Sequence, residues 1–247
     1  MISFGRCGWA VAIPLTFFLL VSCGPTSQGP DTLTDNGASA DEAPASSEST
    51  MSEQEVPADT ELQAELAKPE IEDGHLYAAN EKPPIESMEA FLDQYSDEEL
   101  AQVTRLTLSA NQITQLDGLD RLRNLQVLSL IDNQVLTLRG AELPSTLVSL
   151  SVNGNGLDSL DDIPTIQSLL GLSAERNRIS STEGLDRFPN LKSLALAYNP
   201  IEDFSGLLEL TGMEYISFSY NREVVGDEIL EIAEQIRANN PDAEIYW

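Results

Sequence analysis

A period of 22 residues constrains the fold of this chain more than any other feature. Asparagine recurs at this interval six times, at Asn111, Asn133, Asn155, Asn177, Asn199 and Asn221. Apolar residues lie eight, five and three positions before each of them, as Val103, Leu106 and Leu108 do before Asn111. Six repetitions in one phase indicate that every unit adopts the same structure and stacks on the next one.

The middle of each unit has the pattern of a short β-strand. Inward and outward positions alternate along a strand, so Leu194 is expected to point into the core and its neighbour Ser193 to point away from it. The asparagine turns the chain out of the strand, and its amide is expected to bond with backbone groups that no neighbouring strand reaches. The units therefore predict a parallel sheet with a core on one face.

The units spell L-x-x-L-x-L-x-x-N-x-[IVL], which resembles the leucine-rich repeat, and their length matches its short class. Internalin-type bacterial surface proteins and the regulatory leucine-rich subunit of protein phosphatase type 1 share this class. The resemblance implies an α/β fold, a right-handed solenoid whose parallel sheet forms the concave face. The repeats are expected over about residues 103–223.

Both ends of a solenoid would expose core side chains and need caps. Before the repeats, apolar residues from Met88 to Tyr95 have helical spacing, and Ser96 and Glu99 form a capping box that begins another short helix. After them, Ile229, Ala233 and Ile236 lie on one helical face, and residues 244–247 can add a final strand. Helical caps complete a folded domain that is expected over residues 85–247.

The amino terminus has the pattern of an export signal. An apolar run over residues 9–21 follows Arg6 and ends at Leu20-Val21-Ser22-Cys23, which resembles the bacterial lipobox. The resemblance implies that residues 1–22 are a lipoprotein signal peptide and that Cys23 carries the lipid. An ordinary cleaved signal peptide and an uncleaved anchor are the alternatives. Because Gly24 follows the cysteine, we expect the outer membrane of a bacterial envelope, with the domain facing the periplasm or the cell surface.

Residues 23–84 differ from the repeats in composition. They are rich in Ser, Thr, Ala, Pro and acidic residues and poor in large apolar ones. Such a segment buries too little apolar surface to fold. We expect a disordered acidic tether with a reach of about 45 Å.

Charge and residue usage exclude several classes of function. The chain has 41 acidic and 13 basic residues and a formal charge of -28, so it repels nucleic acid. Its only cysteines are Cys7 and Cys23, and its only histidine, His75, is expected in the tether. No nucleophile with a base and no histidine-ligated metal site can then form in the folded domain, so we expect no enzyme, cofactor or metal. Carboxylate pairs such as Asp161 and Asp162 are interpreted as solvated surface, with calcium binding as the alternative.

The outward strand residues are the candidate site. Small, mostly hydroxylated side chains run along the middle of the predicted concave face, and larger ones gather toward its carboxyl half. Tyrosine and arginine often anchor interfaces because they bury much area and keep a polar group. We expect the partner to contact Arg105, Ile131, Asp132, Asn153, Glu175, Arg176, Tyr198, Tyr215 and Tyr220. The alternative is that the tyrosines merely suit strands and that the serines are a solvated ladder.

These features predict a lipid-anchored protein of the cell envelope that recognises a protein or a glycan through its concave face. We expect it to be a monomer that contacts the membrane through the lipid at Cys23. The alternative is an acidic structural spacer without a dedicated ligand.

Overall fold

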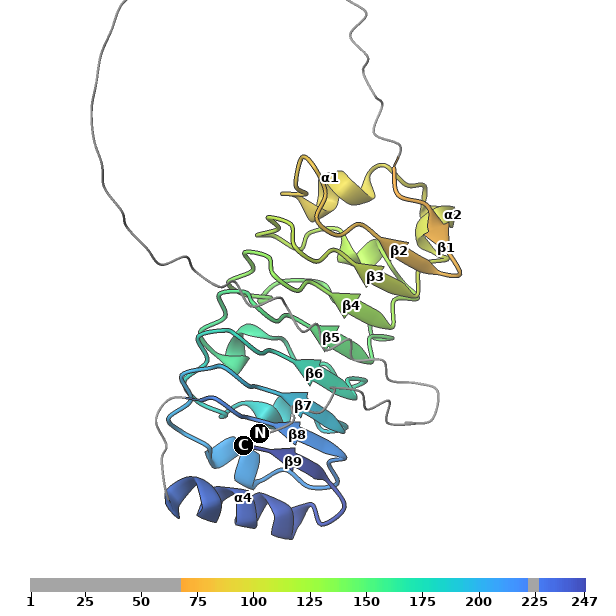
Figure 1. Cartoon of the computed structure of the whole chain (residues 1–247). Helices are drawn as coiled ribbons and strands as arrows, with labels where there is room; N and C mark the ends of the chain where they lie inside the picture. Colours follow the sequence, from red (N-terminus) through yellow and green to blue (C-terminus); the bar gives the residue numbers. More distant parts are fainter. Residues whose placement is uncertain (1–67, 222–226) are drawn as a thin grey trace, which may run out of the picture. The chain divides into compact units, whose positions relative to one another are not determined.

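The repeated units form successive strands of one sheet. The computed structural model describes residues 68–221 and 227–247, and Figure 1 shows their strands as a ladder. Each strand lies beside its neighbour in the sequence, and all pairs are parallel except β1 with β2. The strands are β1 (Ile71–Glu72), β2 (His75–Tyr77), β3 (Arg105–Thr107), β4 (Val127–Ser129), β5 (Ser149–Ser151), β6 (Gly171–Ser173), β7 (Ser193–Ala195), β8 (Tyr215–Ser217) and β9 (Glu244–Tyr246). The predicted parallel sheet and its last strand are confirmed.

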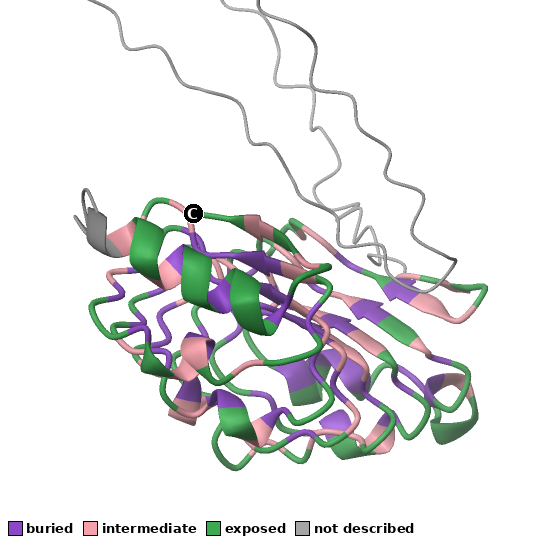
Figure 2. Ribbon diagram, turned by 90° about the horizontal axis from the view of Figure 1, so that it is seen from below, coloured by how far each residue is buried: buried purple, intermediate pink, exposed green. Residues whose placement is uncertain are grey.

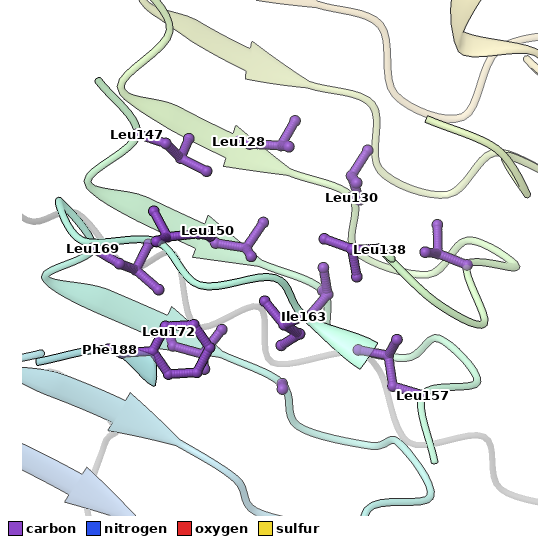
Figure 3. Packing of buried hydrophobic residues seen from close by; sticks show 14 of the residues in the cluster. Leu128, Leu130, Leu138, Leu147, Leu150, Leu157, Ile163, Leu169, Leu172 and Phe188 are labelled. Carbon is purple, nitrogen blue, oxygen red and sulfur yellow. The ribbon is translucent and has the colours of Figure 1, made fainter. Parts of the chain in front are cut away.

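The central residue of each strand points into the core. Leu106, Leu128, Leu150, Leu172, Leu194 and Ile216 lie opposite one another in the register of the sheet, and all are fully buried. Leu128, Leu150 and Leu172 from successive strands project to the same side of the sheet, where they belong to one core cluster with Phe188 (Figure 3). The predicted alternation is confirmed, because the residue before each of these is less buried or too small to enter the core.

Helices occupy most of the connections between successive strands. They are α1 (Met88–Leu92), α2 (Asp97–Leu100), η1 (Leu119–Arg121), η2 (Leu160–Asp162), η3 (Leu185–Arg187), α3 (Ser205–Leu208) and α4 (Asp227–Asn239), where η marks a 3-10 helix. The predicted capping box of α2 is present, because Ser96 and Glu99 each accept a backbone N–H of the other. The described residues thus form an α/β fold of repeated strands with few helices.

Helix α4 lies between β8 and β9 in the chain and packs against α3. Its residues Ala233 and Ile236 are buried, whereas most of the helix is exposed (Figure 2). Asn240 fixes the carboxyl end of the helix: its Oδ1 accepts from the Met213 amide at 2.9 Å, and its Nδ2 donates to the Leu210 carbonyl at 2.8 Å. The side chain that follows the helix therefore bonds it to the last repeat.

The repeated asparagines form a ladder of hydrogen bonds between units. Asn177 Nδ2 donates to the carbonyl oxygens of Ala174 and Glu175 in its own unit and of Val152 in the unit before it. Asn177 Oδ1 accepts from the Leu157 amide, 3.1 Å away. The same pattern recurs at Asn133 and Asn155, so the expectation that the amide satisfies the turn is confirmed.

The expected boundary of the tether at Pro84 is wrong. Residues 68–84 belong to the folded unit, in which β2 pairs in parallel with β3 and Leu76 is fully buried. The reason is local: Leu76 supplies the same inward side chain as the leucines of the repeats, although it lies outside their period. The rest of the expected tether, the signal peptide and Cys23 lie outside the described residues.

Candidate recognition surface

The side of the sheet opposite the core is the candidate surface, called here the outer sheet face. It consists of the first and third residues of strands β2–β9 and of the residue two positions before each repeated asparagine. Small side chains make up its middle, and five of them are buried: Ser151, Ser173, Ala195, Ala197 and Ser217. They form a smooth floor between larger residues.

The amino-terminal part of the face carries a histidine that the sequence placed elsewhere. His75 lies in β2, in register with Arg105 of β3, and not in a tether. Its Nε2 is 2.9 Å from the Thr107 hydroxyl, and its ring meets that of Tyr77 edge-on at 5.7 Å. Burial, and then the charge of Arg105, lower the pKa of His75. The predicted Arg105 is exposed here, and the exposed Tyr77 is a further aromatic residue that the 22-residue period could not reveal.

Asn153 organises the middle of the outer sheet face. Its Oδ1 accepts from the Ser173 hydroxyl and from the backbone amide of Glu175, both at 2.8 Å. Ile131, the other predicted residue here, is half-buried. Asn153 is therefore a positioning residue that fixes the backbone of Glu175.

A row of residues with left-handed backbone borders the outer sheet face. The residue directly before each repeated asparagine has a φ between 54° and 63°, and we call these six residues the left-handed row. They are Ala110, Asp132, Gly154, Arg176, Tyr198 and Tyr220. Side chains rarely adopt this conformation, because it brings Cβ close to the following carbonyl. Four predicted site residues, Asp132, Arg176, Tyr198 and Tyr220, are presented to solvent from this strained backbone.

Gly154 shows how neighbouring members of the left-handed row accommodate one another. A Cβ atom at this position would clash with Oδ1 of Asp132. The missing side chain lets the exposed Asp132 lie over the next unit. Asp132 is therefore turned along the row and not over the floor of the face.

Tyr198 and Tyr220 form an exposed aromatic stack. Their ring centroids are 4.6 Å apart and the ring planes differ by 5°. Tyr198 is 53% exposed and Tyr220 75% exposed. Two large aromatic side chains held parallel in solvent offer a rigid surface whose ordering cost has already been met in the free protein.

Glu175 is the charged residue of the carboxyl half. It lies two positions before Asn177 and is half-buried, and burial raises the pKa of its carboxyl group, an effect that the nearby Arg176 opposes. Among the described residues, no hydrogen bond or ion pair reaches its carboxylate. This is a costly arrangement, since a partly desolvated carboxylate loses water without gaining a counter-ion.

Tyr215 lies on the opposite margin of the same half. It is the first residue of β8, and its ring centroid is 5.6 Å from that of Tyr246 in β9. Burial raises the pKa of Tyr215, the Ser217 hydroxyl opposes this shift, and the negative charge of Glu175 adds to it. The negative charge of Glu175 therefore acts on the Tyr215 hydroxyl across the floor of small residues.

The far end of the sheet adds aromatic residues that the sequence analysis missed. Tyr246 and Trp247 are exposed, and the Arg237 guanidinium lies 5.0 Å from the Trp247 ring centroid. Trp247 and Tyr220 help to line a small hollow with Phe204, Phe218, Asn221 and Ile229. The expected final strand could have revealed these residues, because its pairing with β8 places Tyr246 on the same face as Tyr215.

The described residues contain neither a cluster of metal ligands nor a membrane-spanning helix. No group of three or more His, Cys, Asp or Glu side chains there could hold a metal ion. In the same part of the chain, no helix is long and apolar enough to cross a membrane. The chemistry visible on the outer sheet face is thus that of aromatic rings, one half-buried carboxylate and short hydroxyl groups.

Comparison with known proteins does not assign this surface. No protein-family model matches the chain, and a search of curated proteins gives no match. A function must therefore be argued from the geometry of the face itself.

Proposed function

We propose that the chain is a right-handed leucine-rich-repeat solenoid that binds a macromolecular partner through its concave face. The strict register of β3–β8 supports the repeat, since each strand pairs with residues exactly one period away. In this proposal α1 and α2 cap one end and α4 caps the other. The outer sheet face is then the concave face.

One observation carries the binding function: the parallel stack of exposed Tyr198 and Tyr220. A solvated spacer needs no large aromatic side chains on its surface, whereas interface anchors are enriched in tyrosine. The left-handed backbone that all six residues of the row share holds both tyrosine side chains at the same place in successive units. The protein acts by binding a protein or glycan, as a monomer and without catalysis.

The proposal includes an anchor at Cys23. Acylation of this residue after removal of residues 1–22 would attach the domain to the bacterial envelope, with the outer membrane favoured by Gly24. Cys23→Ala is expected to abolish incorporation of labelled palmitate in intact cells. Equal labelling of the variant would contradict the anchor without affecting the proposal for the concave face.

Site-specific photo-crosslinking tests the concave face. A benzophenone amino acid replaces Tyr198 in one variant and Asp186, an exposed residue of η3, in the other. The partner should crosslink in intact cells from position 198 and not from position 186. Crosslinks from position 186 alone, or none from either position, would favour another surface or a spacer.

The captured partner then allows a quantitative test. Tyr198→Ala and Tyr220→Ala should each weaken its binding by about 2 kcal/mol, because each removes a large contact area. Asp186→Ala should change binding by less than about 0.5 kcal/mol. Wild-type affinity in both tyrosine variants, with melting curves unchanged, would overturn the assignment.

A further inference from the structure

Among the described residues, Glu175 has no ion-pair partner, although it is partly buried. The five ion pairs of the described residues all lie elsewhere, and they join Lys68 to Glu99, Arg121 to Asp93 and Asp97, Arg139 to Asp162, and Arg187 to Asp161. Arg176 follows Glu175 in the chain, but its side chain is exposed and forms none of these pairs. The carboxylate therefore retains its capacity to bind a cation.

Among the described residues, the only cation that influences Glu175 is the neighbouring Arg176, which forms no ion pair with it. On the outer sheet face, strands β5–β9 and the residues two positions before the asparagines carry no lysine or arginine. Their charged members are Glu175 and Glu244, and their large members are Tyr215 and Tyr246. Arg176 borders this region from the left-handed row. The face itself is electronegative, which complements a positively charged ligand.

Tyrosines occupy both margins of the carboxyl half of the outer sheet face, where Glu175 lies. The Tyr198 and Tyr220 stack stands in the row that borders Glu175, and Tyr215 lies close enough across the floor to respond to its charge. The face of an aromatic ring attracts a cation within about 6 Å of its centroid. A carboxylate among several tyrosines thus offers both an ion pair and ring contacts to one ligand.

The floor between these groups suits a long side chain. Ser173, Ala195, Ala197 and Ser217 project little from the sheet and are buried. The methylene stem of lysine or arginine can lie along such a surface while its charged end reaches a polar group. An aspartate or phosphate ligand would be repelled by Glu175, and a sugar would offer its hydroxyl donors but no positive charge.

We propose that Glu175, with Tyr198, Tyr215 and Tyr220 around it, binds a lysine or arginine side chain of the partner protein. This inference rests on the proposed function and adds the chemistry of the partner: a basic segment presented by a protein. The amino-terminal segment of this chain is not complementary, because Arg6 is its only basic residue before Lys68 and its other charges are acidic. Glu175 selects the charge, and the tyrosines supply contact area.

A peptide of alternating serine and arginine residues is a suitable probe for the purified full chain. Calorimetric titration at physiological ionic strength should show binding that Glu175→Gln weakens by about tenfold, since a charged hydrogen-bonding partner is lost. Glu209→Gln, which removes the same charge from an exposed position at the end of α3, should leave the affinity unchanged. Equal losses in the two variants, or no loss in either, would overturn the proposal.

A second peptide tests the ligand, with citrulline in place of arginine. Citrulline has a similar shape without the positive charge, so its peptide should bind at least about tenfold more weakly. Equal binding of the two peptides would show that no cation is selected. Melting curves of Glu175→Gln, which keeps the size of the side chain, exclude loss of folding as the cause.

Tyr198 distinguishes ring contacts from simple charge attraction. Tyr198→Phe keeps an aromatic face and should retain the affinity for the arginine peptide, whereas Tyr198→Leu should lose about threefold to tenfold. Equal affinities of the two variants would show that the ring of Tyr198 does not contact the cation. If the captured partner needs Tyr198 and Tyr220 but binds Glu175→Gln like wild type, this inference fails and the proposed function stands.

Discussion

Each repeated asparagine bonds to two neighbouring units at once, and Asn177 shows the consequence for stability. Its amide hydrogens reach three carbonyl oxygens, and its oxygen accepts the Leu157 amide. The side chain is buried, with 8% exposure, so water cannot replace these bonds. Buried polar groups that lose their partners are among the strongest destabilising changes in proteins.

We therefore expect Asn177→Ala to lower the free energy of unfolding by about 2 to 4 kcal/mol. Asn177→Asp should be similarly harmful, because a carboxylate cannot donate to the three carbonyls. Asn190→Ala is the matched control: this exposed asparagine donates one bond, to the Gln167 carbonyl at 2.8 Å. Urea denaturation of the three variants measures the difference. Equal losses for Asn177→Ala and Asn190→Ala would contradict the role of the ladder.

Glu175 is expected to make stability depend on pH. Burial raises the pKa of its carboxyl group, so the folded chain holds the proton to a higher pH than the unfolded chain. The contribution of Glu175 to stability is therefore most favourable below the ordinary pKa, becomes less favourable as the pH rises to the raised pKa, and stays less favourable at neutral pH. Glu175→Gln removes this cost, and it should raise the free energy of unfolding at neutral pH by up to about 0.5 kcal/mol, since solvent screens the half-exposed group.

Denaturant titrations at neutral pH and at about pH 3 test this sign, because both forms of the side chain are neutral at the lower pH. The gain should vanish there. Glu209→Gln serves as the control for the loss of one negative charge. If Glu175→Gln instead lowered the free energy of unfolding at neutral pH, an interaction within the folded chain would have to stabilise the charged carboxylate.

At the scale of one element, the phase of β7 separates stability from recognition. Leu194 is fully buried in the core, whereas Ser193 belongs to the outer sheet face. Leu194→Ala should cost about 2 to 5 kcal/mol, because it removes buried methyl groups and leaves a cavity. Ser193→Ala should cost less than about 0.5 kcal/mol. Comparable losses in denaturant melts would mean that the two faces of the strand are not independent.

Elements with a repeated or local sequence pattern were predictable from the sequence, whereas elements without one were not. Strands β3–β8 follow from the period, and α2 from its capping box, because repetition and capping use local chemistry. Strand β2 was missed because Leu76 lies in an acidic background, 30 residues before Leu106 and therefore out of phase. Only its pairing with β3 gives this short segment a structure.

The candidate surface was predictable in part for the same reason. Tyr198 and Tyr220 share a position in the period, so their adjacency could be read from the sequence. Their left-handed backbone could not, because tyrosine is not a residue that this conformation favours. That Glu175 forms no ion pair among the described residues was not predictable either, because Arg176 is its neighbour in the sequence.

For the whole molecule, the corrected boundary predicts where truncation becomes harmful. A chain of residues 68–247 keeps β1 and β2, whereas a chain of residues 85–247 exposes the edge of β3. The shorter chain also loses the bond from the Tyr95 hydroxyl to the Pro69 carbonyl, at 2.7 Å, and the bond from Asn111 Nδ2 to the Ala78 carbonyl, at 2.8 Å.

The chain of residues 85–247 should be less stable than that of residues 68–247 by about 3 kcal/mol or more, of which buried Leu76 alone contributes about 2 kcal/mol. Urea melts of both chains measure this difference. A third chain, of residues 68–247 with Leu76→Ala, should fall between them. Identical melting curves of the two truncated chains would show that residues 68–84 do not stabilise the fold and belong to the tether.

The asparagine ladder also has a consequence for evolution. Because every unit offers its neighbours the same bonds, an internal duplication of one period leaves the ladder intact on both sides of the insertion. Each added copy lengthens the sheet by about 4.8 Å, the spacing of one strand. Gene segments of this length can therefore be gained or lost without a new fold, and the outward residues of the added copy are free to diverge.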